Sequence, residues 1–296
     1  MTHSHTSRVT LPATEHEAAI ELPIIGQGTW YMGEGQAQRR KEVQALQQGL
    51  ELGMTVIDTA EMYGDGGAEE VVGEALAGRR DQAFLVSKVY PWNAGRQSAI
   101  DACERSLSRL GTDYLDLYLL HWPGNIPLGE TLEAFEQLRS QGKIRRFGVS
   151  NFDIDELDAL HALPGGDDCA VNQVLYHLGS RGIETALRPW TRRHDLPLMA
   201  YCPLAQAGKL RHDLFGNPVV RELADGLGIT PAQLLLAWVT RPFEGHRDVI
   251  AIPKAVQPAH VEENAAVLTI QLDDDTVARL DDVYPAPTRK VPLDIV

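Results

Sequence analysis

Apolar residues recur along the chain in short runs that alternate with stretches of helical period. The runs are rich in β-branched and other aliphatic residues, as strands buried on both faces of a parallel sheet are. Eight such runs occupy residues 23–29, 54–60, 83–89, 114–121, 145–151, 170–176, 196–202 and 248–254. Several of the intervening stretches end in the glycine that suits a helix C-terminus. Strand and helix therefore alternate throughout, which predicts an α/β fold.

The spacing of the runs indicates a (β/α)8 TIM barrel. Most intervals between them are about 25 to 35 residues, the length of one strand–helix unit. No linker or break in composition divides the chain, so we expect a single domain over residues 1–296. The longer interval 203–247 holds two helical stretches, and we interpret it as an extended loop over the mouth of the barrel.

Both ends of the chain lie outside the strand–helix repeat. Residues 9–13 and 19–23 suit an N-terminal β-hairpin that plugs the bottom of the barrel. The C-terminal tail, residues 284–296, is punctuated by prolines and is expected to fold across a rim.

Charge and composition exclude several classes of partner. With 27 basic and 41 acidic residues, the chain has a formal charge of −14, so neither nucleic acid nor an anionic membrane would gain from meeting its surface. The apolar runs are too short to span a bilayer, and the N-terminus lacks the apolar segment of a secretory signal. We therefore expect a cytoplasmic protein that acts on a small molecule. We expect a monomer, although the sequence leaves oligomers open.

The cysteines and histidines follow no metal-binding or disulfide pattern. Cys103, Cys169 and Cys202 are scattered and odd in number, which fits free thiols in a reducing compartment. No H-E-x-x-H motif or cluster of Cys and His occurs, so no metal site is expected.

Polar residues stand where three consecutive predicted strands end. Asp58, Lys88 and His121 occupy the carboxyl ends of the second, third and fourth runs, and Tyr63 follows in the loop after the second. Each has an ordinary interpretation alone: a turn cap, a rim lysine, a core histidine and loop packing. Because the carboxyl ends of barrel strands converge on one mouth, where active sites lie, we favour a shared site.

Together these four residues have the chemistry of a proton donor. A phenol has a pKa of about 10, and a neighbouring ammonium group lowers that pKa by favouring the phenolate. Lys88 would do this for Tyr63, and Asp58 would keep Lys88 charged. His121 would donate a hydrogen bond to a carbonyl oxygen. The set contains no nucleophile and no electron source, so a hydride donor is implied.

The glycines near the first run do not form the dinucleotide-binding fingerprint. Gly26, Gly28 and Gly33 are spaced G-x-G-x-x-x-x-G, and no helix opens within the motif. They either ease a turn at a strand end or let the backbone approach a ligand ring, and the pattern leaves both interpretations open.

The chain resembles the aldo-keto reductases over nearly its whole length. The motifs that carry the resemblance, in the family's order, are GQGTW, VIDTAEMYGD, LVSKV, DYLDLYLLHWP, GKIRRFGVSNF, NQVLYH, AYCPLA and IPKAVQPAHVEEN. The tail and the CPLAQAG stretch look most like bacterial members grouped with methylglyoxal reductases. The resemblance implies a barrel that reduces aldehydes or ketones, small carbonyls such as methylglyoxal among them, to alcohols with NADPH.

The resemblance also implies roles for individual residues. Its catalytic tetrad is Asp58, Tyr63, Lys88 and His121, with Tyr63 as the proton donor. The residues implied at the nicotinamide end of the cofactor are Gly28, Thr29, Ser150, Asn151, Gln173 and Tyr201, of which Tyr201 stacks on the ring. The loop along the pyrophosphate begins with Cys202, Pro203 and Leu204 and ends at Gly208. The adenosine end meets Lys254, at the 2′-phosphate, and His260, Glu263 and Asn264.

Two positions depart from the usual family pattern. Many relatives have serine where this chain has Ala255, and arginine where it has His260. This chain therefore lacks a hydroxyl group and a bidentate partner for the phosphate. The sequence therefore predicts no strict preference for NADPH, and NADH is a second possible cofactor. We expect Trp30, Trp92 and Trp122 to wall the substrate pocket, the alternative being that they pack at the rim.

Two other functions remain open at the level of sequence. One is a Schiff-base aldolase on the same barrel, with a neutral, nucleophilic Lys88. The other is a regulatory subunit that binds NADPH and turns over little. The complete tetrad favours the reductase, while the physiological carbonyl compound stays unidentified.

Overall fold

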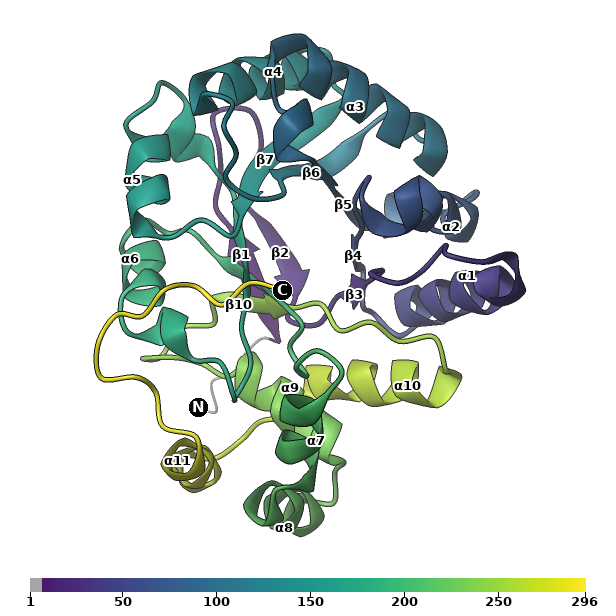
Figure 1. Cartoon of the computed structure of the whole chain (residues 1–296). Coiled ribbons are helices and arrows are strands. Elements are labelled where there is room, and N and C mark those ends of the chain that lie inside the picture. The colour runs from purple at the N-terminus through teal and green to yellow at the C-terminus, as the bar shows by residue number, and fades with distance from the viewer. Residues whose placement is uncertain (1–6) are drawn as a thin grey trace.

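The computed structural model describes residues 7–296, which form a closed barrel of parallel strands ringed by helices (Figure 1). The barrel strands are β3 (Gln27–Gly28), β4 (Val56–Asp58), β5 (Phe84–Val89), β6 (Leu115–Leu120), β7 (Ile144–Ser150), β8 (Asn172–Leu175), β9 (Leu198–Tyr201) and β10 (Val249–Ala251). Each strand pairs in parallel with its neighbour in the chain, and a parallel bridge between Ile25 and Ala251 joins the last strand to the first. The predicted (β/α)8 fold is confirmed, with most strands shorter than their apolar runs.

The helices lie outside the ring of strands. They are α1 (Gln36–Glu51), α2 (Gly67–Ala75), α3 (Arg96–Leu110), α4 (Leu128–Ser140), α5 (Ile154–His161), α6 (Leu187–Arg193), α7 (Lys209–Gly216), α8 (Pro218–Leu227), α9 (Pro231–Val239), α10 (Pro258–Ala266) and α11 (Asp274–Val283). The interval 203–247 is therefore mostly helical. Only its first part reaches the mouth, whereas α9 packs against β10 and α10, and α8 packs against α9 and α11.

The N-terminal hairpin plugs the bottom of the barrel, as predicted. Its strands β1 (Arg8–Leu11) and β2 (Ile20–Pro23) pair antiparallel, and the ring surrounds them in projection in Figure 1. The turn of the hairpin is tied to the amino end of β7, where the Arg146 guanidinium donates to the Ala18 carbonyl. The opposite, carboxyl ends of the strands are thus left to form the mouth.

The barrel closes through a very close approach of its first and last strands. The Gly28 amide donates to the Pro253 carbonyl at 3.1 Å. A β-carbon on Gly28 would lie 2.6 Å from the Ile252 carbonyl oxygen, closer than real side chains come. This position therefore requires glycine for space rather than for backbone conformation.

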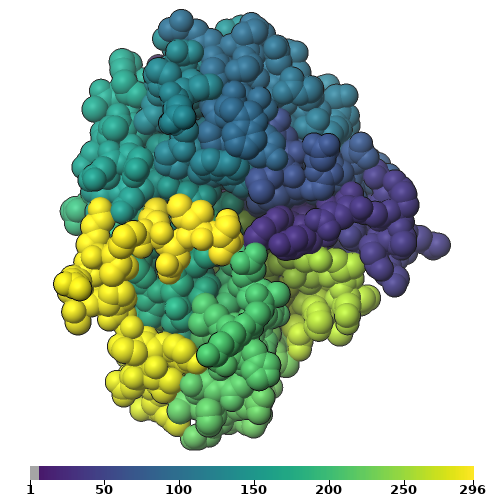
Figure 2. Space-filling model, viewed as in Figure 1, coloured from purple at the N-terminus to yellow at the C-terminus, as the bar shows by residue number. Residues whose placement is uncertain are grey.

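The C-terminal tail crosses the rim, as expected, and is fastened along its length. The Thr185 hydroxyl donates to the Pro287 carbonyl at 3.0 Å, and Lys290 pairs with Asp153 at 3.1 Å. The Asp294 carboxylate accepts from the Ser180 hydroxyl. Figure 2 shows the tail in yellow meeting the purple segment after β3 and the green segment after β9. Three segments that are distant in the sequence thus surround the mouth.

The state of the cysteines and the hydropathy of the helices also bear on the class of protein. All three cysteines are free, as predicted. Within residues 7–296, none of the helices has the length and hydropathy that a bilayer crossing would need.

Candidate active site

The four predicted catalytic residues meet at the mouth of the barrel. Asp58 is the last residue of β4, Lys88 lies near the end of β5, and His121 directly follows β6. Tyr63 begins a short 3-10 turn after β4. Strand pairing sets Asp58 opposite Val86, two residues before Lys88, so both side chains reach the same rim.

Lys88 is the centre of this cluster. Its ammonium nitrogen lies 2.7 Å from Asp58 Oδ2, 2.8 Å from the Thr59 carbonyl oxygen and 3.1 Å from Tyr63 Oη. The second oxygen of Asp58 accepts from Gln173 Nε2 at 2.7 Å. Three acceptors match the three N–H groups of a charged lysine, whereas a neutral amine has only two. The geometry therefore favours an ammonium at Lys88.

Burial dominates the electrostatics of the cluster. It raises the pKa of Asp58 and lowers the pKa of Lys88, while the ion pair between them opposes both shifts. Burial, and then the Asp58 carboxylate, raise the pKa of Tyr63 well above its ordinary value of 10.0. The net lowering of the Tyr63 pKa that we expected from the sequence is wrong for this structure. The sequence showed the neighbouring lysine but gave no measure of how completely the phenol is buried.

His121 is held neutral beside the phenol. Burial, and then the Lys88 ammonium, lower the pKa of His121 well below 6.5. Its ring meets that of Tyr63 edge-on, with centroids 5.7 Å apart, and its buried Nδ1 has no partner among the described residues. A neutral imidazole carries one N–H donor, so His121 offers a hydrogen bond without a positive charge.

A cavity of about 1050 Å³ opens beside these residues. Asp58, Tyr63 and His121 line it, while Lys88 lies behind them with a fully buried side chain. Its volume is at the upper end of the range of about 300 to 1,000 Å³ that is usual for small-molecule sites. It has room for a long ligand and a small second one.

Most of the predicted cofactor residues line this cavity. These are Gly28, Thr29, Ser150, Asn151, Gln173, Tyr201, Cys202, Pro203, Leu204 and Lys254. Tyr201 Oη donates to Asn151 Oδ1 at 2.8 Å, and Asn151 Nδ2 donates to the His121 carbonyl at 3.2 Å. These bonds fix the tyrosine ring and the amide beside the catalytic cluster.

Besides Lys88, the predicted residues of α10 and one of the three tryptophans lie outside the cavity lining. His260, Glu263 and Asn264 belong to α10, which begins four residues after Lys254. Trp92 also lies outside it and is 61% exposed, so the prediction that it walls the pocket is wrong. Trp30 and Trp122 do line the cavity.

The cavity also contains residues that sequence reasoning did not assign. Ile295 and Val296 bring the end of the tail into its wall, and Tyr31 and Met62 line it near the tetrad. Arg211 lines it from α7, and its guanidinium donates to the Leu204 carbonyl at 3.2 Å. The only signal for the tail was its position outside the repeat, and nothing in the sequence distinguished Arg211 from other surface arginines.

Arg211 and Lys254 are the two lysine or arginine residues that line the cavity in the described part of the chain. Neither has a carboxylate within ion-pair distance among residues 7–296. Burial lowers the pKa of Arg211 from its ordinary value, yet a guanidinium stays charged at any physiological pH. In a chain with a formal charge of −14, two such cations beside one cavity favour an anionic ligand.

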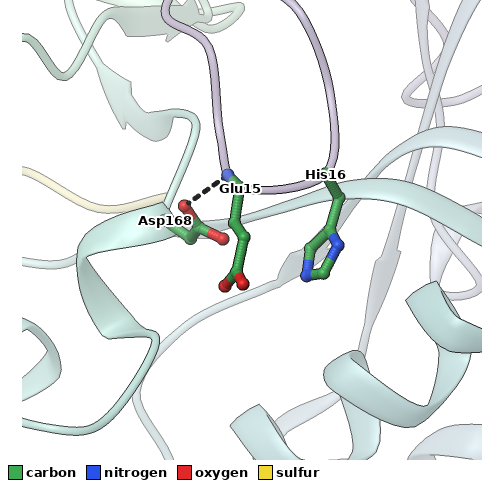
Figure 3. A group of neighbouring side chains, drawn as sticks. All are labelled: Glu15, His16 and Asp168. Carbon is green, nitrogen blue, oxygen red and sulfur yellow. Dashed lines mark hydrogen bonds between the residues drawn. The ribbon is translucent and has the colours of Figure 1, made fainter.

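One group of potential metal ligands lies at the other end of the barrel (Figure 3). Glu15 and His16, in the turn of the hairpin, come close to Asp168. The Asp168 carboxylate already accepts from the Glu15 amide at 3.2 Å and from Arg139 at 2.7 Å. His16 lies 3.6 Å from Glu136. These contacts attach the turn of the hairpin to the rest of the barrel, which accounts for the proximity of the three side chains.

The chain is similar to several known proteins over nearly its whole length. The chain is 61% identical to the methylglyoxal reductase YeaE of Escherichia coli K12, over 94% of this chain and 96% of that protein. It is 35% identical to the methylglyoxal reductase DkgA of the same organism, over 88% and 90% of the two chains. An aldo/keto reductase from Klebsiella pneumoniae, crystallised with NADP and acetate, superposes with a TM-score of 0.92 at 57% identity, covering 98% of this chain and 100% of that one. The model of the aldo/keto reductase family matches residues 24–285, and the chain belongs to this family.

Proposed function

We propose that this protein reduces small aldehydes and ketones to alcohols, with NADPH as the hydride donor and Tyr63 as the proton donor. The observation that carries the proposal is Lys88 Nζ, placed 2.7 Å from Asp58 Oδ2 and 3.1 Å from Tyr63 Oη at the wall of a large cavity. Two bacterial relatives are named methylglyoxal reductases, which makes small dicarbonyl compounds the first substrates to test.

The residues of the cavity fit a nicotinamide cofactor. Ser150, Asn151 and Gln173 present hydroxyl and amide groups for the carboxamide, and the Tyr201 ring is held in place for stacking. Lys254 and Arg211, which form no ion pair within residues 7–296, provide cations for phosphate groups. When bound there, the cofactor supplies a hydride to the carbonyl carbon.

Tyr63 supplies the proton to the carbonyl oxygen. Its raised pKa keeps the phenol protonated across the neutral range. It still acts as an acid because the carbonyl oxygen, once it receives negative charge, approaches the basicity of hydroxide, which is a far stronger base than a phenolate. Lys88, which already donates to Tyr63 Oη, stabilises the phenolate left behind, and Asp58 keeps Lys88 charged. A proton from solvent then restores the phenol.

His121 orients the substrate. Because the pKa of its imidazole lies well below 6.5, the ring is neutral at physiological pH and donates through a single N–H. A hydrogen bond from this ring holds the carbonyl oxygen next to Tyr63, and its strength increases as negative charge develops on the oxygen.

The geometry argues against the other two functions. A Schiff-base aldolase needs a neutral lysine, whereas Lys88 Nζ contacts three acceptors, which is the pattern of an ammonium. A subunit that only bound NADPH would have no use for the buried Asp58–Lys88–Tyr63 chain.

Tyr63→Phe tests the proposal because it removes the hydroxyl and keeps the ring. We expect kcat for methylglyoxal to fall at least about 100-fold, the lower range for a positioned general acid. The dissociation constant for NADPH, measured by fluorescence titration, should stay within a few-fold of wild type. Tyr31→Phe is the matched control, since Tyr31 lines the same cavity without contacting Lys88. A Tyr63→Phe enzyme that kept more than about a tenth of the wild-type rate would show that Tyr63 is not the acid.

A further inference from the structure

Trp92 forms an exposed aromatic surface just outside the cavity. It lies in a 3-10 turn between β5 and α3, and 61% of its side chain is accessible to solvent. Its ring stacks on that of Tyr90, with centroids 4.2 Å apart and an angle of 21° between the planes. Trp92 therefore presents a solvent-exposed aromatic surface on which a ligand ring can stack.

This surface is continuous with the catalytic mouth. Trp122 meets Trp92 edge-on at 5.7 Å, and on its other side it packs against the His121 ring at 4.9 Å. Trp122 lines the cavity, whereas Trp92 does not. The three rings therefore form a path that leads outward from the group proposed to hold the carbonyl oxygen.

The turn that carries Trp92 is held rigidly. The buried Glu61 carboxylate accepts from the Tyr90 amide at 2.8 Å and from Asn93 Nδ2 at 3.0 Å. On the other side, a β-carbon on Gly124 would lie 2.5 Å from Pro91 Cβ, so the loop after β6 packs directly against the turn. A ring fixed in this way loses little conformational entropy when a ligand stacks on it.

We propose that Trp92, together with Tyr90 and Trp122, is an outer subsite that stacks an aromatic group carried several bonds away from the reacting carbonyl. This proposal rests on the proposed function and extends it to longer arylalkyl aldehydes and ketones. The carboxylates of Glu61 and Asp65, which together with burial raise the pKa of Tyr90, make the surroundings negative. The subsite therefore takes neutral or cationic aromatic groups and rejects anionic ones.

The subsite is tested by binding, without relying on turnover. Phenylpentanol and pentanol are titrated calorimetrically into wild type, Trp92→Ala and Trp92→Phe in the presence of NADP. We expect Trp92→Ala to weaken phenylpentanol binding about 3- to 10-fold, the range that an aromatic pair provides beyond buried area, and to leave pentanol binding unchanged. Trp92→Phe should keep most of the affinity. Equal affinities of wild type and Trp92→Ala for phenylpentanol, or an equal loss for both alcohols, would overturn the subsite.

Kinetics separate the subsite from the proposed function. With phenylpentanal, Trp92→Ala should raise KM and spare kcat, whereas with methylglyoxal both constants should stay within about twofold of wild type. Leu227→Ala, on α8, removes a similarly exposed apolar side chain far from the mouth and should change neither. If wild type reduced no aldehyde at all, the proposed function would fail, while the binding titration would still decide the subsite.

Discussion

Lys254 stands at the rim of the cavity with its ammonium group free of ion pairs among the described residues. NADPH differs from NADH by a 2′-phosphate, which a lysine would recognise as a point charge. We predict that Lys254→Met weakens NADPH binding about tenfold, a modest value for an exposed charge-assisted hydrogen bond. NADH binding should change by less than about twofold. Fluorescence titration with each cofactor measures both constants, and equal losses would refute the assignment.

A substitution at His260 should strengthen the preference for NADPH, whereas Lys254→Met should weaken it. It lies exposed on α10, outside the cavity lining. His260→Arg adds a permanent charge with a bidentate geometry, so the ratio of kcat/KM for NADPH over NADH should rise. An unchanged ratio would place His260 too far from the phosphate to matter.

The residues at the mouth were predictable because polar, chemically reactive side chains stand at the positions where the apolar strands end. Asp58, Lys88 and His121 stand out as polar residues at the ends of apolar runs. The protonation behaviour of Tyr63 was not predictable, because it depends on burial that many distant residues create together. The same holds for Arg211, which becomes informative only once the fold brings it to the cavity without a carboxylate partner.

At the scale of elements, β3 and β10 form the seam of the barrel, and Gly28 sets how closely they approach. Since a β-carbon there would lie 2.6 Å from the Ile252 carbonyl, Gly28→Ala must push the two strands apart. We predict a loss of about 1 to 3 kcal/mol in the free energy of unfolding, as for other overpacked sites. Urea unfolding followed by circular dichroism measures it.

Gly129 provides the matched control for this substitution. It lies in the first turn of α4, and a β-carbon there would meet no atom within 4 Å. Gly129→Ala should therefore leave stability unchanged or raise it slightly, because alanine favours a helix. If both variants lost the same stability, the close approach at the seam would not be the cause.

The elements themselves differ in how far the sequence revealed them. The eight strands were visible because parallel strands buried on both faces are mostly apolar, as are β5 and β6, which are buried at every position. The two helical stretches of the interval 203–247 were visible in the sequence, but α8 and α9 pack on the outside of the barrel rather than over the mouth. Helical period marks a helix, but it does not tell whether that helix covers the mouth or packs on the outside of the barrel.

At the scale of the whole molecule, buried histidines couple stability to pH. Burial lowers the pKa of His177 to about 4 and the pKa of His121 well below 6.5. The unfolded chain binds these protons near pH 6.5 and the folded one does not, so stability present above about pH 6.5 is lost as the pH falls toward 4. We predict that His177 alone accounts for up to about 3 kcal/mol of this loss.

Urea unfolding at a series of pH values between 7 and 4 measures this effect. In His177→Gln, which cannot bind the proton, the loss of stability over this range should be smaller than in wild type. His212→Gln replaces an exposed histidine and should follow the wild-type curve. Parallel curves for wild type and His177→Gln would contradict the assignment.

The two ends of the described chain lie at opposite ends of the barrel, and this affects how the protein should be handled. Ser7 adjoins the hairpin at the bottom, whereas Val296 belongs to the wall of the cavity. An affinity tag fused after Val296 would begin at the mouth and compete with ligands for space. A tag at the other end of the chain joins the described structure at Ser7, on the hairpin side, so it is attached away from the cavity that cofactor and substrate would occupy.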